Sequence, residues 1–465
     1  MADTRVIVVG IDSSTQSTKV VRVDAATGEV LSLASAPHPD GTAVDPERWW
    51  DALVAAGGTE LDGVAAVAVG GQQHGMVALD ASNAPVFDAL LWNDTRSASQ
   101  AERLAAELGP QTWAAEIGVV PVASFTVSKI AWLAEEHPEL AARVTRLMLP
   151  HDWLTWRLLG QRHAPTTDRS DASGTGYWSV PDERYREQLV EKVFGHAVEL
   201  PRVLGPSEPA GRIGGTVVGP GAGDNAGAAL GLGLREGEVV VSVGTSATVF
   251  TSTDTRIVDP TGAIAGFADA TGRQLPLLAM LNGARTLVAT AAMLGTDVAG
   301  LDRLASEGAV DAGGLTLVPY LDGERTPNLP DATGSLVGMT RANMTQQNLA
   351  RSAVLGLLCG IADALESLRG HGVSVTKVLL IGGGAQSRSL QDAAADVLGV
   401  PVEVPEQAEY VAFGAARQAA WVLSGDAEPP TWARRVERSI EPSSDRGWAI
   451  ALRERYSAAV NTLYY

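Results

Sequence analysis

Two aspartates in turns of small residues are the groups of this sequence best suited to chemistry. Asp12 follows the apolar residues 6–11 and precedes Ser13-Ser14-Thr15, and Asp224 lies in a glycine-rich turn ahead of an Ala-rich segment. Beside a phosphate-type turn an aspartate can hold Mg²⁺, directly or through water, because Mg²⁺ takes one or two carboxylates together with phosphate oxygens. An uncovered carboxylate can also take the proton of a hydroxyl nucleophile. Taken singly, each also has a structural explanation: Asp12 as a turn residue bonding its own backbone, and Asp224 as a helix N-cap.

The turn beside Asp12 has a counterpart halfway along the chain. Residues 6–24 and 239–251 each predict a buried strand, a tight turn of small hydroxyl residues and a returning strand. Small residues let backbone N–H groups approach an anion closely, and their hydroxyls add donors. One such hairpin in each half indicates two related domains that grip one polyphosphate from both sides. Because only the first turn carries an acid, we expect that half to handle the metal and the chemistry.

A loop of neutral polar residues stands between Gly71 and Gly75. It consists of Gln72, Gln73 and His74 and follows a predicted strand. A single histidine is most often a satisfied structural residue. Two amides and an imidazole in one short loop are better suited to a polyhydroxylated ligand, because such groups reject analogues that lack the matching hydroxyl.

Other turns and motifs narrow the class of enzyme. The glycines at 382–384 follow a predicted strand, but they do not form GxGxxG with a downstream acid, so a dinucleotide fold is unsupported. The sequence also contains no GxxxxGK[ST] P-loop, no GxSxG elbow, no HExxH and no protein-kinase HRD set. The histidines are scattered without the spacing of metal ligands.

Strands and helices alternate in both halves, which predicts an α/β fold. A strand at residues 64–69 ends in the glycines ahead of His74, where α/β folds place binding groups. Residues 210–220, rich in Gly and Pro, predict a loop. The other predicted elements are helices near residues 46–53, 100–108, 128–136, 285–294, 348–369 and 389–398, a strand at 378–381, and a helical end to the Arg-rich tail 428–465.

Length and charge restrict the possible partners. The 465 residues exceed what one hydrophobic core usually serves, so we predict two domains, residues 1–234 and 235–465. The single cysteine, Cys359, excludes an internal disulfide and fits a reducing cytosol, and no segment reaches about 18 uninterrupted apolar residues. The formal net charge of −19 argues against nucleic acid or an anionic membrane as partner. We therefore expect a cytoplasmic protein that binds small molecules.

Together these motifs resemble the FGGY family of carbohydrate kinases, and the resemblance covers almost the whole chain. One family signature is matched in full by residues 124–136. A second spans residues 334–355 and departs at Leu355, where an acid or amide is usual. The resemblance implies two related actin- and hexokinase-like (ribonuclease H-like) domains with the active site in the cleft between them. It makes residues 1–234 the sugar-binding domain with the catalytic aspartate and residues 235–465 the ATP-binding domain.

The resemblance also implies a role for each site residue. Asp224 matches the general base, and Asp12 matches the acid near Mg²⁺ and the γ-phosphate. The sugar contacts match Gln73, His74 and Asn225, with Asp94 and Phe125 as further candidates. The phosphate turns and the region around the adenosine match Thr15, Gln16, Ser17, Lys19, Thr245, Gly283, Gly383, Gly384 and Ser387.

Within the family, residues 71–75, 91–94, 170–174 and 319–327 are most similar to members that act on D-xylulose. This implies ATP- and Mg²⁺-dependent phosphorylation of D-xylulose to D-xylulose 5-phosphate in pentose catabolism. Two residues depart from the usual pattern, Gln73 where Met is common and Ser14 where Gly is usual. Gln73 keeps another sugar or polyol open, such as ribulose, gluconate or erythritol.

Two alternatives from other classes remain at this point. One is a non-catalytic sugar sensor on the same scaffold, which the intact aspartates oppose. The other is an actin- or Hsp70-like assembly or chaperone protein, which would not need the Gln-His loop. The oligomeric state is open, with a homodimer as one option.

Overall fold

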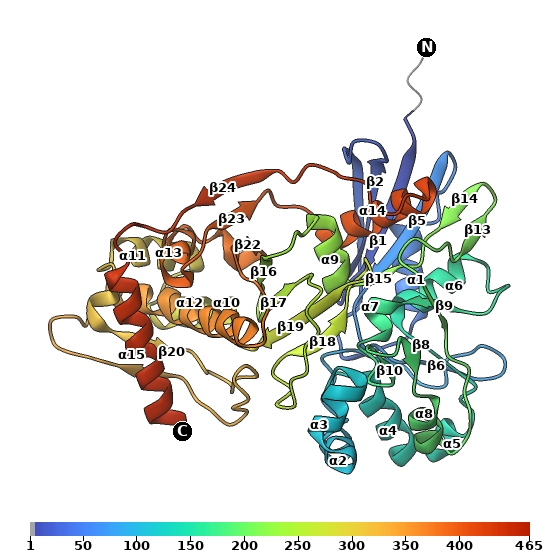
Figure 1. Cartoon of the computed structure of the whole chain (residues 1–465), viewed down its shortest axis with the longest axis horizontal. Coiled ribbons are helices and arrows are strands. Elements are labelled where there is room, and N and C mark those ends of the chain that lie inside the picture. The colour runs from blue at the N-terminus through green and yellow to red at the C-terminus, as the bar shows by residue number, and fades with distance from the viewer. Residues whose placement is uncertain (1–4) are drawn as a thin grey trace. The chain divides into compact units, whose positions relative to one another are not determined.

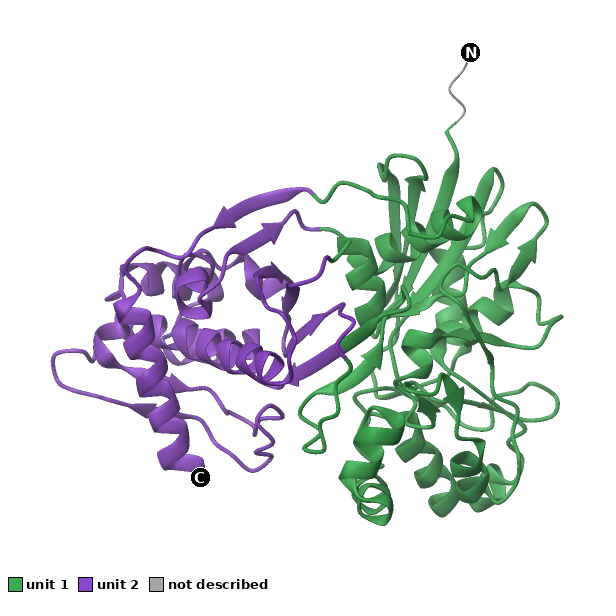
Figure 2. Ribbon diagram, viewed as in Figure 1, with its two compact units in different colours: residues 1–234, 256–275, 408–434 green, residues 235–255, 276–407, 435–465 purple. Residues whose placement is uncertain are grey.

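The structure, a computed structural model, describes residues 5–465 and contains two compact units (Figures 1 and 2). The first unit comprises the chain up to Leu234 together with Arg256–Leu275 and Ala408–Arg434. The second comprises Arg235–Thr255, Pro276–Gln407 and Arg435–Tyr465. The predicted cut between residues 234 and 235 falls on a boundary of these units. A single cut does not describe them, however, because two later segments pack with the first unit.

The first unit is built on a sheet with strand order β13-β14-β5-β1-β2-β3, in which β15 also pairs with β5. Strand β1 is parallel to β5 and antiparallel to β2, and β5 is parallel to β14 and β15. These strands are β1 (Ile7–Ser13), β2 (Ser17–Asp24), β3 (Val30–Pro37), β5 (Val64–Gly71), β13 (Gly211–Ile213), β14 (Thr216–Val218) and β15 (Ala222–Gly223).

The prediction of a loop over residues 210–220 is wrong in part. Strands β13 and β14 form an antiparallel hairpin there and extend the sheet beside β5. The β-branched residues Thr216, Val217 and Val218 favour a strand, and Gly214-Gly215 supplies the turn. Of the residues that predicted a loop, Gly211 lies in β13, Gly214-Gly215 forms the hairpin turn, and Gly219-Pro220 follows β14.

Alternate residues of β1 pack on opposite faces of the sheet, as the two-residue period of a strand requires. On one face Val8 joins Ala66 and Ala68 of β5 in a core cluster with the alanines of helix α14 (Tyr410–Ser424). On the other face Val9 packs in a cluster that includes Trp49 of α1 (Glu47–Ala55) and residues of α6 (Pro150–Leu158). The strand reads as continuously apolar because both faces are covered.

Helix α14 lies directly against β1, although some 400 residues separate them in sequence (Figure 1). A Cβ atom on Gly10 would clash with the carbonyl oxygen of Ala412, so only glycine admits the helix at this distance. Gly414 faces Gly227 of helix α9 (Asp224–Leu232) in the same way. Close packing through small residues explains why residues 408–434 belong to the first unit.

The remaining elements of the first unit are helices and short strands. Helix α4 (Thr126–Glu136) includes the predicted helix 128–136 and ends before Pro138, which opens the short helix α5 (Pro138–Ala141). The other elements are α2 (Ala98–Leu108), α3 (Pro110–Thr112), the π-helical turn Trp113–Ile117, α7 (Arg169–Ala172), α8 (Glu187–Phe194), β4 (Ala43–Val44), β6 (Val77–Leu79), β7 (Ala89–Leu90), β8 (Arg146–Met148), β9 (Thr166–Asp168), β10 (Trp178–Ser179), β11 (Arg184–Tyr185), β12 (Arg202–Leu204) and β18 (Ala265–Ala268).

The second unit repeats the local pattern of the first around its own hairpin. Its strands follow the order β19-β17-β16-β22-β23-β24, and β16 is antiparallel to β17 and parallel to β22, as β1 is to β2 and β5. The duplicated hairpin predicted from the sequence is thereby confirmed. The elements are β16 (Glu238–Val243), β17 (Ala247–Thr251), β19 (Gln274–Met280), β20 (Thr316–Val318), β21 (Ser335–Val337), β22 (Lys377–Ile381), β23 (Val402–Pro405), β24 (Val436–Ile440), α10 (Ala284–Met293), α11 (Val298–Glu307), α12 (Gln346–Gly370), α13 (Arg388–Leu398) and α15 (Gly447–Tyr464).

Helix α12 is the central helix of the second unit. By length and composition it could cross a membrane, but 83% of its most apolar window is buried inside the protein. Its contacts with α10, α11 and α13 account for that burial. Leu355, the departure from the second family signature, is fully buried in this helix, so its apolar side chain serves the core.

Candidate functional site

The first turn places Asp12 at the end of β1 with one carboxylate oxygen unused. Oδ2 accepts a hydrogen bond of 2.8 Å from the Ser14 hydroxyl and lies 3.6 Å from Lys19 Nζ, which also pairs with Glu409 at 2.8 Å. Oδ1 is buried and has no hydrogen-bond partner among the described residues. Burial raises the pKa of Asp12 to about 6, against the opposing charge of Lys19. A buried, unpartnered carboxylate oxygen beside a phosphate-type turn fits a divalent cation.

Ser14 is accommodated in this turn without strain. Its backbone lies outside the left-handed region, so glycine is not required there, and its N–H donates to Ser17 O at 3.0 Å. The hydroxyl orients Asp12. Thr15 accepts a hydrogen bond of 2.9 Å from the indole Nε1 of Trp92, a side chain that is 40% exposed. Gln16 and Ser17 complete the turn, with Ser17 as the first residue of β2.

Asp224 is brought next to Asp12 by the pairing of three strand ends. In the sheet, Asp12 of β1 and Ala222 of β15 both pair with Gly70 of β5, one on each side. Asp224 follows β15 as the first residue of α9, and Gly223 occupies the N-cap position. The structure therefore makes Asp224 the first residue of the helix, one residue after the cap, so the prediction of Asp224 as the helix N-cap is wrong.

The carboxylate of Asp224 is oriented by the residue that follows it. Oδ1 accepts hydrogen bonds from the backbone N–H of Asn225 at 2.7 Å and from Asn225 Nδ2 at 2.8 Å. Burial and the negative charge of Asp12 raise the pKa of Asp224 to about 7, against the hydrogen bonds from Asn225 that lower it. A carboxylate poised near neutral pH has the proton affinity that a general base needs.

The polar loop after β5 joins the Asp224 turn. Gln73 Oε1 accepts from Asn225 Nδ2 at 3.3 Å, and Gln73 Nε2 donates to the carbonyl oxygen of Ser170 at 3.3 Å. A Cβ atom on Gly223 would lie 2.7 Å from the Gln73 side chain, so the glycine beside Asp224 admits the glutamine. The structure thus brings together Gln73, Asn225 and Asp224, which the sequence predicted as one site.

His74 adopts a left-handed backbone conformation with φ of 68°, which is uncommon for a residue other than glycine. Its Nδ1 is hydrogen bonded to the carbonyl oxygen of Gly174 at 2.8 Å. The ring packs at a tilt against Phe125, with a centroid distance of 4.8 Å, and against Phe267, with 5.5 Å. Phe125 therefore acts on His74 as an aromatic support, and Phe267 is a second support that sequence reasoning missed.

Asp94, also predicted as a sugar contact, is not part of the hydrogen-bonded group of Gln73, Asn225 and Asp224. It is buried, and it accepts hydrogen bonds from Thr42 at 2.7 Å and from Arg96 at 2.8 Å. Burial alone would raise the pKa of Asp94, but these hydrogen bonds and the Arg96 charge lower it below the usual value. In this structure the carboxylate orders residues 92–96, and through them it supports Trp92.

In the second unit, Thr245 lies in the turn between β16 and β17. Gly283 packs against that turn, since a Cβ there would lie 2.7 Å from the carbonyl oxygen of Gly244, and Arg285 N donates to Thr245 O at 3.2 Å. Gly384 packs against Val243 at the end of β16, where a Cβ would lie 2.5 Å from the valine side chain. A Cβ on Gly383 would meet only open space.

Ser387 caps helix α13 by accepting from Leu390 N at 3.2 Å, and its hydroxyl donates to Asp302. The structure therefore gathers Thr245, Gly283 and Gly384 at the ends of β16 and β22, whereas the Ser387 hydroxyl is engaged in a helix cap.

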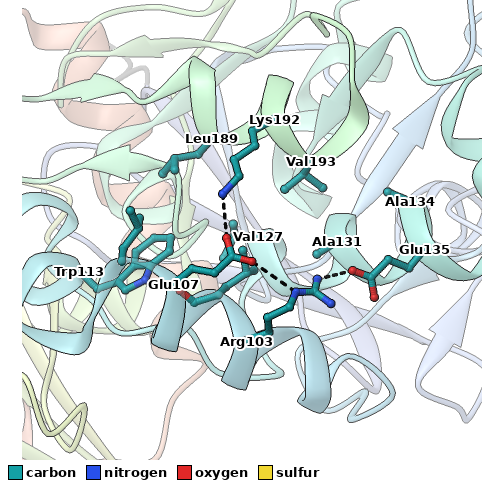
Figure 3. A pocket seen from close by; sticks show the side chains of 12 residues that line it. Arg103, Glu107, Trp113, Val127, Ala131, Ala134, Glu135, Leu189, Lys192 and Val193 are labelled. Atoms are coloured by element: carbon teal, nitrogen blue, oxygen red, sulfur yellow. Dashed lines mark hydrogen bonds and ion pairs between the residues drawn. The ribbon is translucent and has the colours of Figure 1, made fainter.

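A pocket of about 370 Å³ lies elsewhere in the first unit, between α2, α4 and α8 (Figure 3). Trp113, Val127 and Ala131 form apolar walls, and ion pairs of Arg103 and Lys192 with glutamates border the opening. None of the predicted site residues lines this pocket.

Comparison with known proteins shows to which family of proteins this chain belongs. Residues 7–244 match the N-terminal domain of the FGGY family of carbohydrate kinases, and residues 239–423 match its C-terminal domain. The chain belongs to this family.

Among individual relatives, the chain is 47% identical to a xylulose kinase of Streptomyces coelicolor, over 94% of this chain and 92% of that protein. It is 31% identical to a xylulose kinase of Escherichia coli, over 88% and 89%. The solved xylulose kinase of Bifidobacterium adolescentis superposes with a TM-score of 0.90 at 45% identity, covering 98% of this chain and 99% of that one. A gluconate kinase of Lactobacillus acidophilus, also at a TM-score of 0.90 but 20% identical, shares the fold.

Proposed function

We propose that this protein transfers the γ-phosphoryl group of ATP to D-xylulose, giving D-xylulose 5-phosphate. The observation that carries the proposal is the hydrogen-bonded group of Gln73, Asn225 and Asp224, in which a carboxylate with a pKa of about 7 lies among neutral polar side chains. The names of the relatives at 47% identity support D-xylulose as the sugar.

Asp224 takes the proton of the sugar hydroxyl that attacks phosphorus. Asn225 holds its Oδ1 through two hydrogen bonds, which leaves Oδ2 to accept the proton. A positioned base of this kind contributes roughly 10²–10⁴-fold to the rate. Gln73 and His74 orient the remaining hydroxyls, and the fixed geometry of both side chains reduces the entropy lost on binding.

Asp12, whose Oδ1 has no hydrogen-bond partner among the described residues, would hold Mg²⁺ directly or through water, with Lys19 beside its Oδ2. Mg²⁺, when bound, neutralises charge on the phosphates. Backbone N–H groups of Thr15, Gln16 and Ser17, together with the hydroxyls of Thr15 and Ser17, contact the transferred phosphoryl group. In the second unit, Thr245 contacts phosphate and Gly383 leaves room for the adenosine, while Gly283 and Gly384 allow the surrounding turns to pack closely.

The net charge of −19 disfavours binding of nucleic acid or an anionic membrane to the protein surface. The single cysteine, Cys359, is buried. Both features support a cytoplasmic enzyme whose partners are ATP and a sugar. A homodimer stays an untested option.

A coupled ADP-release assay with D-xylulose, D-ribulose, gluconate, erythritol and glycerol tests the proposal. We expect Mg²⁺-dependent ADP release with D-xylulose at the highest kcat/KM. A higher kcat/KM with another substrate would assign the enzyme to that sugar or polyol. Failure of all five to release ADP, with sugar binding retained, would favour a sugar sensor.

A further inference from the structure

A histidine behind the substrate loop faces three carboxylates at once. His151 of helix α6 is fully buried, and its Nε2 lies 3.3 Å from Asp152, 3.3 Å from Asp168 and 3.2 Å from Asp171. All three carboxylates are buried as well. Buried charges are stable only when paired, so this cluster of four residues requires positive charge.

The available positive charge is that of the imidazole itself. Arg169, the basic residue on the same short helix as Asp171, turns to Glu183 at 2.6 Å and to Asp269 at 3.7 Å. Although burial lowers the pKa of His151, the three carboxylates raise it to about 9, which makes the ring an imidazolium at neutral pH. Burial also raises the pKa of Asp171, against the opposing charge of His151.

The imidazole ring packs against the strand ends that carry the substrate loop and the base. A Cβ on Gly71, the last residue of β5, would lie 3.1 Å from His151 Cβ. A Cβ on Gly221, ahead of β15, would lie 2.5 Å from His151 Nδ1. Both glycines therefore admit the ring directly behind the site.

A chain of hydrogen bonds connects the cluster to the site through Ser170. Asp168 caps helix α7 by accepting from Ser170 N at 2.7 Å and from Asp171 N at 3.1 Å. Ser170 in turn accepts from Gly223 N at its Oγ, at 3.0 Å, and from Gln73 Nε2 at its carbonyl oxygen, at 3.3 Å. Ser170 thus holds both the residue before the base and the predicted sugar contact.

We propose that His151 is a positioning residue, a buried cation that fixes the carboxylates of Asp152, Asp168 and Asp171 and, through Ser170, aligns Gln73 and Asp224. It touches neither sugar nor ATP. This inference rests on the proposed function only for the identity of the sugar.

A metal ion bound by three of these four residues is the alternative outcome. His151, Asp152 and Asp171 offer ligand atoms within 4.8 Å of one another. The imidazolium is favoured because His151 Nε2 lies within 3.3 Å of all three aspartates. Asp152 Oδ1 and both oxygens of Asp171 have no hydrogen-bond partner among the described residues, so bound metal is measured directly in the test below.

The deciding variants separate charge from shape. His151→Lys keeps a cation and offers three N–H donors to three carboxylates, whereas His151→Gln keeps a polar side chain without charge. Ser170→Ala removes the hydroxyl that holds Gly223. His196→Gln, at a histidine bound to Val144 O outside the cluster, is the matched control.

For each full-length variant we would measure KM for the sugar and for ATP, kcat, melting temperature and bound metal by mass spectrometry. We expect His151→Gln and Ser170→Ala to lower kcat/KM for the sugar about tenfold or more, with KM for ATP changed less than about threefold. His151→Lys and His196→Gln should stay within about threefold of the unmodified protein.

Sugar kinetics of His151→Gln equal to those of the unmodified protein would overturn the inference. An equal fall in kcat/KM for the sugar in His151→Lys and His151→Gln would also overturn it. Stoichiometric metal in the unmodified protein that both His151 variants lose would assign a metal site instead. If His151→Gln does not fold, the inference stands only if His151→Lys is folded and active and Ser170→Ala weakens sugar use. If the enzyme prefers another sugar, the proposal of D-xylulose as substrate is wrong. The same variants are then compared with that preferred sugar, so this inference is tested independently.

Discussion

At the scale of single residues, Asp224 should be indispensable for turnover and dispensable for binding. Replacement by Asn keeps the shape and the Asn225 contact but removes the proton acceptor, so kcat should fall at least ~10²-fold. Steady-state kinetics with isothermal titration of sugar and ATP would test this. Asp51→Asn, at an exposed position of α1, is the control. A kcat close to that of the unmodified protein would remove Asp224 from the role of base.

The raised pKa of Asp224 predicts the pH dependence. The base acts in its ionised form, so kcat/KM should be at its plateau above about pH 7 and fall roughly tenfold per pH unit below it. Saturating Mg²⁺ keeps Asp12 ionised during the measurement. A plateau that extends down to about pH 5 would indicate a carboxylate with an ordinary pKa and contradict the role of burial.

His74 should affect sugar use more than ATP use. Its ring is hydrogen bonded to Gly174 and packs at a tilt against Phe125, and His74 lies in the same loop as Gln73, which bonds Asn225 beside Asp224. Loss of a neutral hydrogen bond in a closed site costs about 1–3 kcal/mol, so His74→Ala should lower kcat/KM for xylulose roughly 10- to 100-fold. Kinetics on the folded variant, varying each substrate in turn, would measure this. A parallel fall in melting temperature and in both substrate parameters would indicate a purely structural histidine.

At the scale of elements, the contact between β1 and α14 determines whether Asp12 is held in place. Gly10→Ala would place a methyl group against the Ala412 carbonyl, and overpacking of this kind costs about 1–3 kcal/mol or more. We expect a lower melting temperature and weaker Mg-ATP binding, because Asp12 lies two residues further along the strand. Gly215→Ala, where a Cβ meets only open space, is the control. Equal melting temperatures for the two variants would show that α14 adapts.

At the scale of the whole molecule, the return of residues 408–434 to the first unit makes a cut at residue 234 harmful. A fragment of residues 1–234 would lack α14 and expose Val8, Ala66 and Ala68 on one face of the sheet. Exposed apolar faces promote association. We therefore expect aggregation or dye binding by this fragment and recovery when residues 408–434 are fused to it, measured by light scattering and fluorescence. A monomeric, cooperatively melting 1–234 fragment would contradict the assignment.

The local chemistry was readable from the sequence because it depends on neighbours along the chain. Small hydroxyl residues after an apolar run predicted both hairpins, and the polar loop at 72–74 and the Asp224 turn were identified from residue type and spacing. The same local signals wrongly predicted a loop over residues 210–220, where the glycines lie in and beside a short hairpin. They also gave no indication of helix α14, because its many alanines are compatible with several environments.

Only the tertiary structure decided which of these pieces meet. Pairing of β1 and β15 on either side of Gly70 places Asp12 beside Asp224, although more than 200 residues separate them. Glu409 reaches Lys19 because α14 packs on β1, and His151 lies behind the site because glycines admit its ring. Such encounters depend on packing between distant segments, and that packing is decided by shape and burial, which no local pattern of residues records.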